Sequence, residues 1–248
     1  MIAARAEPRR PHEDCDVVSS SDDYARRFAG AVGAWMLAVQ ADAALQLTSR
    51  WRGGSVLDVG GGHAQLAGLF AAVGHHVTIL GSHPSCGERP RRLRTDHPVT
   101  FTVGDVMNPP FEPRSFDIVL AFRMMAHVHD WRAFLAGLCR VARRAVVIDF
   151  ATPVSVNAIA PLLFSMKKKV ETNTRRFALQ RRGPVAAAFA EHGFTRVQHI
   201  GQYVAPMALH RMMKAPAVSR GLEAALHALG LARWFGSPVV MCAQRQEA

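Results

Sequence analysis

The sequence predicts an α/β fold, a seven-stranded and mostly parallel Rossmann-like sheet with helices on both faces. Short apolar runs alternate with helical stretches from Ser55 onward, which is typical of βαβ units. Three glycines follow the first of these runs and precede a helical stretch. A chain of 248 residues that is 49% hydrophobic can bury one sizeable core, so we expect one domain over residues 21–248.

The strands are expected where apolar runs are bounded by turn residues, at Val56–Val59, Val77–Leu80, Thr100–Val103, Phe116–Ala121, Ala145–Phe150, Thr195–Tyr203 and Pro238–Gln244. Helices are expected at Gln65–Ala72 and at Trp131–Val141, and a third should begin at Pro184. Proline suits a first helical position, and Gly193 is placed to end this third helix.

The N-terminal region divides into a tail and a helix. Residues 1–20 are polar, contain prolines and lack periodicity, so they predict a flexible tail. A helix should follow, because Ser20 or Ser21 can cap it and apolar residues recur at helical spacing as far as about Leu47.

Two segments exceed the βαβ repeat, at about residues 151–182 and 205–237. Both follow strands, and segments after strand carboxyl ends border the ligand crevice of an open parallel sheet. We therefore expect two helical lids that roof a pocket together with the N-terminal helix. Their mixture of methionine, other apolar residues and basic residues suits a lid over an oily ligand, contact with an anionic membrane surface, or plain domain packing.

Charge and composition narrow the possible partners. The formal net charge of +11 favours anionic partners, but no aromatic residues interleave with the basic clusters, so nucleic acid is disfavoured. No long uncharged apolar run and no apolar leader segment is evident, which predicts a cytoplasmic protein. The four cysteines are scattered, and no metal site is expected.

The glycine turn carries the strongest motif. Asp58 ends the strand, and Gly60, Gly61 and Gly62 follow, so a ligand can lie against the backbone. This geometry serves any nucleotide. A dinucleotide fingerprint needs a small residue where Gln65 stands, so a nicotinamide cofactor fits poorly.

The context of the turn adds a resemblance. VLDVGGGHA matches the acid-x-Gly-x-Gly-x-Gly pattern, with alanine at the last glycine, and VGDVMNPPFEPRSFDIVLAF and AHVHDWRAFLAGLCRV follow. This succession resembles class I S-adenosylmethionine-dependent methyltransferases of the ubiquinone and menaquinone biosynthesis type, the methyltransferase type 11 group. The resemblance covers roughly residues 24–150.

The resemblance implies S-adenosylmethionine as the cofactor. Asp105 would accept a hydrogen bond from the adenine amino group, with Val106 beside the ring. The implied cofactor-binding residues are Asp58, Gly60, Gly61, Gly62, Gly81, Ser82, Asp105, Val106, Phe122 and Arg27.

One position departs from the family pattern. The second strand should end in an acid that bridges both ribose hydroxyls, but Gly81 and Ser82 occupy that end. A serine hydroxyl cannot make the bidentate, charge-assisted contact of a carboxylate. We expect Ser82 itself, or His83 in the following loop, to take over the ribose contact.

The candidate catalytic residues are His127, His129 and Arg123, which follow the fourth strand. Methyl transfer mainly needs alignment and exclusion of water, plus a base where the acceptor loses a proton, and histidine suits that role. Packing beneath the cofactor loop is the alternative for His127. Arg123 either faces a cofactor carboxylate or anionic substrate, or pairs with Asp149 as a buried structural ion pair.

The motif Asn108–Phe111 spells the NPPF sequence of amino-methyltransferases, but it precedes the fourth strand instead of following it. We interpret it as an ordinary loop. The function predicted is O- or C-methylation of a small, apolar or partly anionic metabolite. The alternatives are an RNA methyltransferase and a catalytically silent binding protein with the same fold.

Overall fold

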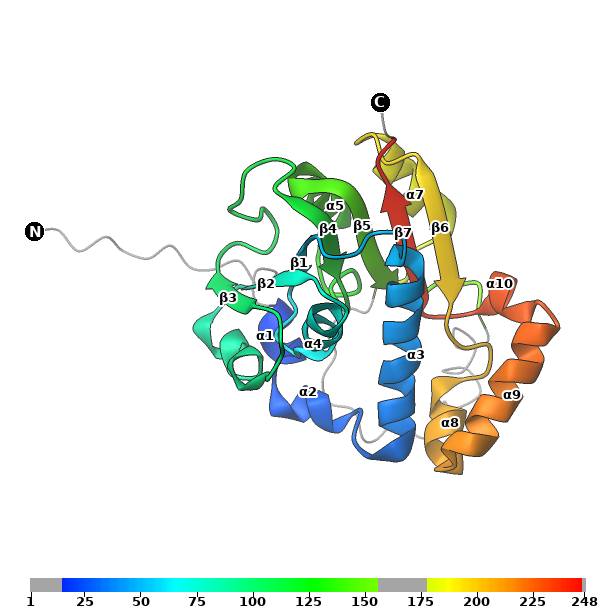
Figure 1. The fold of residues 1–248 in the computed structure, drawn as a ribbon. Coiled ribbons are helices and arrows are strands. Elements are labelled where there is room, and N and C mark those ends of the chain that lie inside the picture. Colours follow the sequence, from blue (N-terminus) through cyan, green and yellow to red (C-terminus); the bar gives the residue numbers. More distant parts are fainter. Residues whose placement is uncertain (1–14, 156–177, 247–248) are drawn as a thin grey trace, which may run out of the picture.

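A seven-stranded sheet organises the chain, as the sequence predicts (Figure 1). The computed structural model describes residues 15–155 and 178–246. The strand order is β3-β2-β1-β4-β5-β7-β6. The strands are β1 (Ser55–Val59), β2 (His76–Gly81), β3 (Val99–Val103), β4 (Phe116–Ala121), β5 (Ala142–Phe150), β6 (Arg196–Gly201) and β7 (Val239–Gln244).

The direction of the strands places the ligand crevice. β1 to β5 are parallel, and β7 runs antiparallel to both β5 and β6. The strand order reverses between β1 and β4. Ligands in open α/β sheets bind outside the carboxyl ends of the strands at such a switch point, so the glycine turn after β1 lies where a ligand is expected.

Helices cover both faces, because alternate strand residues point to opposite sides. Ile118 of β4 packs with α3 (Gly30–Thr48) and α4 (Gln65–Ala72) in one core cluster. Val119 packs with α5 (Trp131–Val141) and α7 (Arg182–Ala190) in the other. The helices α4 and α5 have the predicted bounds, whereas α7 begins before the predicted Pro184.

The N-terminal predictions need two corrections. The single helix expected up to about Leu47 is two helices, α2 (Asp22–Arg26) and α3, because Gly30 adopts a φ of 77° and breaks the path. Ser21 caps α2 by accepting a hydrogen bond from the Tyr24 backbone amide at 3.2 Å. The predicted tail over residues 1–20 is also wrong in its last part, since Cys15–Ser19 forms helix α1.

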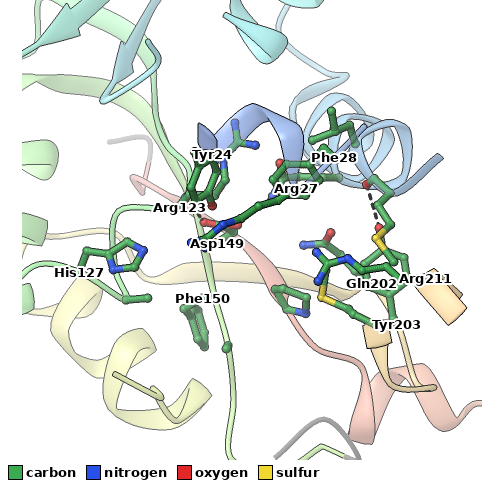
Figure 2. Close-up of a pocket in the computed structure, with 17 residues that line it drawn as sticks. Tyr24, Arg27, Phe28, Arg123, His127, Asp149, Phe150, Gln202, Tyr203 and Arg211 are labelled. Atoms are coloured by element: carbon green, nitrogen blue, oxygen red, sulfur yellow. Dashed lines mark hydrogen bonds between the residues drawn. The ribbon is translucent and has the colours of Figure 1, made fainter. Parts of the chain in front are cut away.

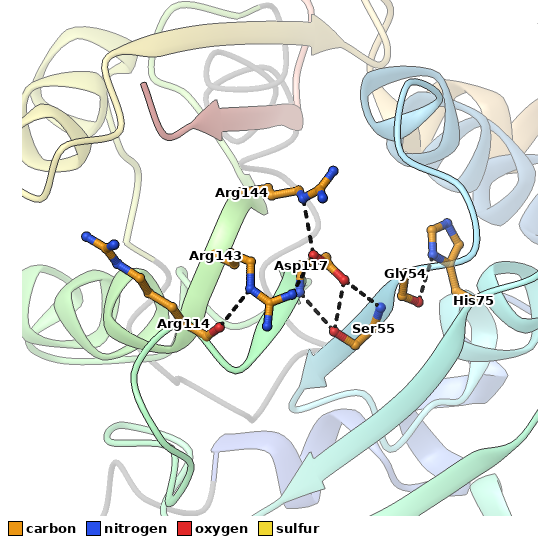
Figure 3. Close-up of polar contacts among 7 residues, drawn as sticks. All are labelled: Gly54, Ser55, His75, Arg114, Asp117, Arg143 and Arg144. Carbon is orange, nitrogen blue, oxygen red and sulfur yellow. Dashed lines mark hydrogen bonds and ion pairs between the residues drawn. The ribbon is translucent and has the colours of Figure 1, made fainter. Parts of the chain in front are cut away.

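A polar cluster holds the opposite, amino-terminal edge of the sheet together (Figure 3). Asp117 of β4 accepts hydrogen bonds from the Ser55 amide at 3.0 Å and the Ser55 hydroxyl at 3.2 Å. It also forms ion pairs with Arg143 and Arg144 of β5, at 3.1 and 3.2 Å. One carboxylate therefore links β1, β4 and β5, away from the ligand crevice.

The second insertion is helical, as expected. It contains α8 (Met207–Met213), α9 (Pro216–Ala228) and α10 (Leu231–Phe235), and α8 and α9 stand beside α3 (Figure 1). The buried Glu223 carboxylate accepts hydrogen bonds from the amides of Val204 and Ala205 at 2.9 and 3.0 Å, and lies 2.9 Å from His210 Nε2. This network ties α9 to the end of β6.

Two short 3-10 helices, Pro84–Gly87 and Pro90–Arg92, follow β2. The loop containing Asn108–Phe111 connects β3 to β4, as predicted, and the Arg140 guanidinium donates to the Phe111 carbonyl at 2.6 Å. Most of the first expected lid, residues 156–177, lies outside the described residues. Within the described ranges, none of the helices has the length and apolar character that crossing a bilayer requires.

Candidate active site

The glycine turn after β1 is closely packed. Gly60 has a φ of 72°, and a Cβ added to it would lie 2.4 Å from Met124 Sδ. A Cβ on Gly62 would lie 2.0 Å from Ser20 Oγ and 2.8 Å from the Cys86 carbonyl oxygen. Only glycine fits these positions, and Gly60 and Gly62 are buried beneath these neighbours. A glycine turn between a strand and a helix at the switch point is nevertheless the arrangement that holds a nucleoside-bearing cofactor such as S-adenosylmethionine.

Asp58 lies beneath this turn. Its carboxyl is buried, and a Cβ on Gly61 would lie 2.2 Å from Asp58 Oδ2. Burial raises the pKa of Asp58 to about 7, although the charge of Arg123 acts in the opposite direction. Asp58 can therefore change its charge near neutral pH, directly below the backbone that is expected to hold the cofactor.

The end of β2 has no room for an acid at its last residue. Gly81 is buried, and a Cβ there would lie 2.8 Å from Cys86 Cβ and 3.0 Å from the Phe101 ring. Ser82 follows, and both its amide and its hydroxyl donate to the carboxylate of Asp16, at 2.7 and 2.6 Å. His83 contacts Ser85 instead. The Ser82 hydroxyl thus already has an anionic partner.

That partner comes from α1, which sequence reasoning treated as tail. Asp16 is fully buried, and Cys15 Sγ lies 3.9 Å from Met124 Sδ after β4. Ser20, just past α1, lies against Gly62. Helix α1 and the adjoining Ser20 therefore contact the glycine turn, the end of β2 and the segment after β4, which are the three walls of the predicted cofactor groove.

The other predicted cofactor residues of this region differ in exposure. Asp105 is exposed, and its carboxylate accepts a hydrogen bond from the Met107 amide at 2.8 Å, so it is available at the rim. Val106 is fully buried beside it. Phe122 is buried and packs into the core cluster of α3 and α4, and its contact with the cofactor stays a prediction.

Beside the cofactor groove lies a cavity of about 380 Å³ (Figure 2). Its walls come from α2, α3, the segment after β4, the end of β5 and the segment from β6 into α8. Tyr24, Arg123 and Asp149 gather on one side, and Gln202, Tyr203 and Arg211 on the other. The cavity was expected in this position, but Tyr24, Gln202, Tyr203 and Arg211 were not among the predicted site residues.

Arg123 lines the cavity from a left-handed backbone conformation, with a φ of 62°. Its guanidinium carbon lies 5.9 and 5.7 Å from the ring centres of Tyr24 and Phe28. Its Nη1 is buried and makes no hydrogen bond within the described part of the chain. Arg123 contacts Asp149 through its backbone amide, and the described contacts include no ion pair between the two side chains, which was one of the two alternatives for Arg123.

Asp149 stands at the carboxyl end of β5 and is 5% exposed. Burial raises its pKa to about 6, against the hydrogen bonds from the Arg123 amide and the Gln40 side chain. Gln40 of α3 donates to it at 2.8 Å. Asp149 therefore couples the helix over the crevice to the segment that carries Arg123.

The two candidate histidines are placed differently. His127 is half-buried and lines the cavity, and its backbone amide donates to the Met124 carbonyl at 2.9 Å. His129 is exposed beside Asp130, which caps α5, and does not line the cavity. Arg27 lines the cavity, with its guanidinium 5.2 Å from the Tyr24 ring centre. In the described ranges, no three His, Cys, Asp or Glu side chains form a metal-binding group.

The strand order, with its single antiparallel strand, and the glycine turn at the switch point define the fold of class I methyltransferases. Residues 57–148 match the family described as a methyltransferase domain. The chain thus has the class I methyltransferase fold, and S-adenosylmethionine is the cofactor that this fold and the matched segment indicate.

Curated relatives match over short stretches. The demethylmenaquinone methyltransferase of Corynebacterium glutamicum is 40% identical over 62 residues, covering 24% of this chain and 27% of the relative. The norajmaline N-methyltransferase of Rauvolfia serpentina is 28% identical over 85 residues, covering 34% of this chain and 29% of the relative. The matched region thus spans less than a third of each relative's length.

Solved structures match along most of the chain. A Synechocystis magnesium protoporphyrin IX methyltransferase with bound S-adenosylhomocysteine has a TM-score of 0.63 and 15% identity, covering 93% of this chain and 98% of that chain. A Haemonchus contortus N-methyltransferase, in complex with phosphomonomethylethanolamine and S-adenosylhomocysteine, has a TM-score of 0.58 and 16% identity. Its alignment covers 84% of this chain and 52% of that chain. At these identities the likeness concerns the fold.

Proposed function

We propose that this protein transfers a methyl group from S-adenosylmethionine to an oxygen or carbon of a small, largely apolar metabolite that carries a negative charge. The observation that carries the proposal is the cavity beside the glycine turn. Aromatic and aliphatic side chains make most of its wall, while the guanidiniums of Arg27, Arg123 and Arg211 face it. Asp149 is the acid among these residues, and its pKa of about 6 means that it loses its opposing charge as the pH falls through that value.

The cofactor supplies an activated methyl carbon when it is bound. The protein would supply position and a dry environment. Rings such as Tyr24 and Tyr203 would enclose the apolar body of the acceptor. Arginine would bind an acceptor carboxylate or phosphate, because its planar fork makes paired hydrogen bonds. His127 would accept the proton of an acceptor hydroxyl.

The relatives named above support a small-molecule acceptor, since demethylmenaquinone, norajmaline and phosphomonomethylethanolamine are all small molecules. The size of the cavity supports it as well, because about 380 Å³ lies in the range of pockets that enclose ligands of this kind. Both arguments favour a metabolite over RNA as the acceptor.

The proposal is tested first by calorimetry with S-adenosylhomocysteine on the purified protein. Binding is expected, and an absence of heat at high concentration would refute cofactor use. Methyl transfer is then measured with tritiated S-adenosylmethionine on paired acceptors, each an aromatic hydroxy acid and its neutral amide. The acid should react faster, and Arg211→Gln should reduce this preference. Equal rates for acid and amide would contradict the assignment of the cationic wall.

The base is tested with histidine variants on any acceptor that reacts. His127→Ala should lower turnover of a hydroxyl acceptor by roughly 10²- to 10⁴-fold, the usual contribution of a general base. His129→Ala tests the other predicted residue. His192→Ala, which removes an exposed imidazole next to α7, serves as the matched control. Unchanged turnover in His127→Ala would remove His127 from the mechanism.

The alternatives have distinct outcomes. An RNA methyltransferase would bind RNA with an affinity that falls steeply with added salt. A silent binding protein would bind S-adenosylhomocysteine and methylate none of the acceptors. The cytoplasmic location is likewise a proposal, and cell fractionation tests it.

We also propose a peripheral contact of the second insertion with anionic membranes. Large apolar side chains are unusually exposed there, including Met212 at 64%, Leu229 at 73% and Trp234 at 64%. Arg220 and Arg233 belong to the same insertion. Sedimentation with phosphatidylglycerol vesicles, compared with phosphatidylcholine vesicles, tests this contact through the charge dependence of binding.

A further inference from the structure

The end of β2 lacks the acid that an adenosyl cofactor needs for its ribose. A ribose diol presents two hydroxyl donors, and a carboxylate at this strand end would accept both. Gly81 leaves no room for any side chain, and Ser82 can offer only one hydroxyl. An adenosyl cofactor bound here would lack the charge-assisted contact that normally fixes its sugar.

A carboxylate nevertheless stands at this place. Asp16 Oδ2 accepts the Ser82 amide at 2.7 Å, and Asp16 Oδ1 accepts the Ser82 hydroxyl at 2.6 Å. The Cys86 thiol donates to Oδ2 at 3.4 Å. A side chain from the start of the described chain thus delivers an acid to the position that β2 leaves without one.

The bonding of Asp16 leaves it able to accept more. A carboxylate has about four acceptor sites, and the described partners take two on Oδ2 and one on Oδ1. These partners are the neutral N–H, O–H and S–H groups of Ser82 and Cys86, so among the described residues no cation neutralises Asp16 through a hydrogen bond. A fully buried carboxylate held only by neutral donors gains from each further hydroxyl that donates to it, because burying a charge costs free energy unless hydrogen bonds compensate it.

The local backbone fixes Asp16 in this orientation. The Ser20 amide and hydroxyl both donate to the Asp16 carbonyl, at 2.9 and 2.6 Å. The Ser19 hydroxyl donates to the same carbonyl at 3.0 Å. Ser20 in turn packs against Gly62. Ser19 and Ser20 therefore fix the position of α1 beside the glycine turn, with the Asp16 carboxylate directed toward β2.

We propose that Asp16 is the ribose-binding acid of this methyltransferase, supplied by the N-terminal helix α1 and anchored by Ser82. This inference rests on the proposed function, since it assumes an adenosyl cofactor in the groove. It replaces the expectation that Ser82 or His83 contacts the ribose alone. Ser82 becomes a positioning residue that acts through Asp16.

The test is a binding cycle between Asp16 and the ribose hydroxyls. Calorimetry compares S-adenosylhomocysteine with its 2′-deoxy and 3′-deoxy analogues, on wild type and on Asp16→Asn. Asp16→Asn should weaken S-adenosylhomocysteine binding by about 10- to 100-fold, the range for a hydrogen bond to a charged group. Removing a ribose hydroxyl should weaken wild type similarly, but should cost Asp16→Asn little more.

A merely structural role gives another pattern, in which Asp16→Asn weakens all three ligands by the same factor. If α1 instead blocks the groove, Asp16→Asn should bind S-adenosylhomocysteine more tightly than wild type. Either result overturns the inference. An absence of binding by wild type refutes the proposed function itself and is distinguishable from both.

Two further variants serve as a control and as a substitute for Asp16→Asn. Asp23→Asn is the matched control, because Asp23 is an exposed acid of α2, and it should leave all affinities unchanged. Should Asp16→Asn fail to fold, the exchange variant D16S/S82D returns the carboxylate to the strand end. It should bind S-adenosylhomocysteine and discriminate against both deoxy analogues. A folded exchange variant that binds all three ligands equally would contradict the ribose role.

Discussion

Replacing Asp149 by asparagine should change how the stability of the protein depends on pH. Burial raises the Asp149 pKa from 3.8 to about 6. Each unit corresponds to about 1.4 kcal/mol, so ionisation of Asp149 in the folded state costs roughly 3 kcal/mol. A carboxyl with a raised pKa binds its proton more tightly when folded. Its contribution to stability is therefore fully present below pH 3.8 and is lost as the pH rises through about 6.

The assay is urea unfolding of wild type and Asp149→Asn between about pH 4 and pH 8. Over this interval, the free energy of unfolding of the variant should rise relative to wild type by roughly 2 kcal/mol, because only wild type has this carboxyl to ionise. The difference between the two proteins isolates Asp149 from Asp58, whose pKa is also raised. A difference that does not change with pH, or that changes in the opposite direction, would refute the reasoning.

Asp117 provides a control of opposite sign. Burial alone would raise its pKa, but hydrogen bonds from the Ser55 amide and hydroxyl, with the charges of Arg143 and Arg144, lower it. A carboxyl with a lowered pKa stabilises the fold above its ordinary pKa, and that stability is lost as the pH falls. Asp117→Asn should thus lose stability near neutral pH, and the loss should shrink at acid pH.

Three other predictions follow from the packing. Glu223→Ala should lower the free energy of unfolding by about 3 kcal/mol or more, because it strands the amides of Val204 and Ala205, whereas Glu191→Ala at an exposed ion pair should have almost no effect in the same urea assay. Gly62→Val should displace Ser20 and speed amide exchange over residues 15–20, whereas Gly221→Ala, in open space within α9, should raise stability by about 0.5–1 kcal/mol; unchanged exchange would contradict the packing of α1. Burial raises the pKa of Cys86 to about 11 and of Cys139 and Cys242 to about 12, so a thiolate-specific reagent should label these residues slowly at pH 8 in the folded protein, and rapid labelling would count against their burial.

The elements that were predicted well are those whose signal is local. Alternation of apolar runs with helical periods located all seven strands within a few residues, and α4 and α5 at their predicted bounds. The glycine turn was also predictable, because a backbone conformation such as the φ of 72° at Gly60 selects glycine directly. The presence of glycine at such a position directly indicates a positive φ.

The features that were missed depend on partners far away in the sequence. Residues 15–19 are only five residues long, too few for a helical period to distinguish α1 from a tail. The position of α1 follows from the contact of Asp16 with Ser82, 66 residues later. The cavity-lining role of Arg211 likewise depends on how α8 packs on α3. One sequence signal points to Asp16: the glycine and serine at the end of β2 leave the ribose without an acid, so another acid must come from elsewhere in the chain.

The site joins three chain segments through charges that change near neutral pH. Asp149 holds Gln40 of α3 and the backbone of Arg123, while the Arg123 charge acts on both Asp149 and Asp58. Because both carboxyls have raised pKa values, protonating either increases the net positive charge beside the cavity. The proposed anionic acceptor would then bind more tightly, and its own charge would in turn raise the pKa of both carboxyls. Acceptor affinity and the charge state beneath the glycine turn are therefore coupled through a single guanidinium.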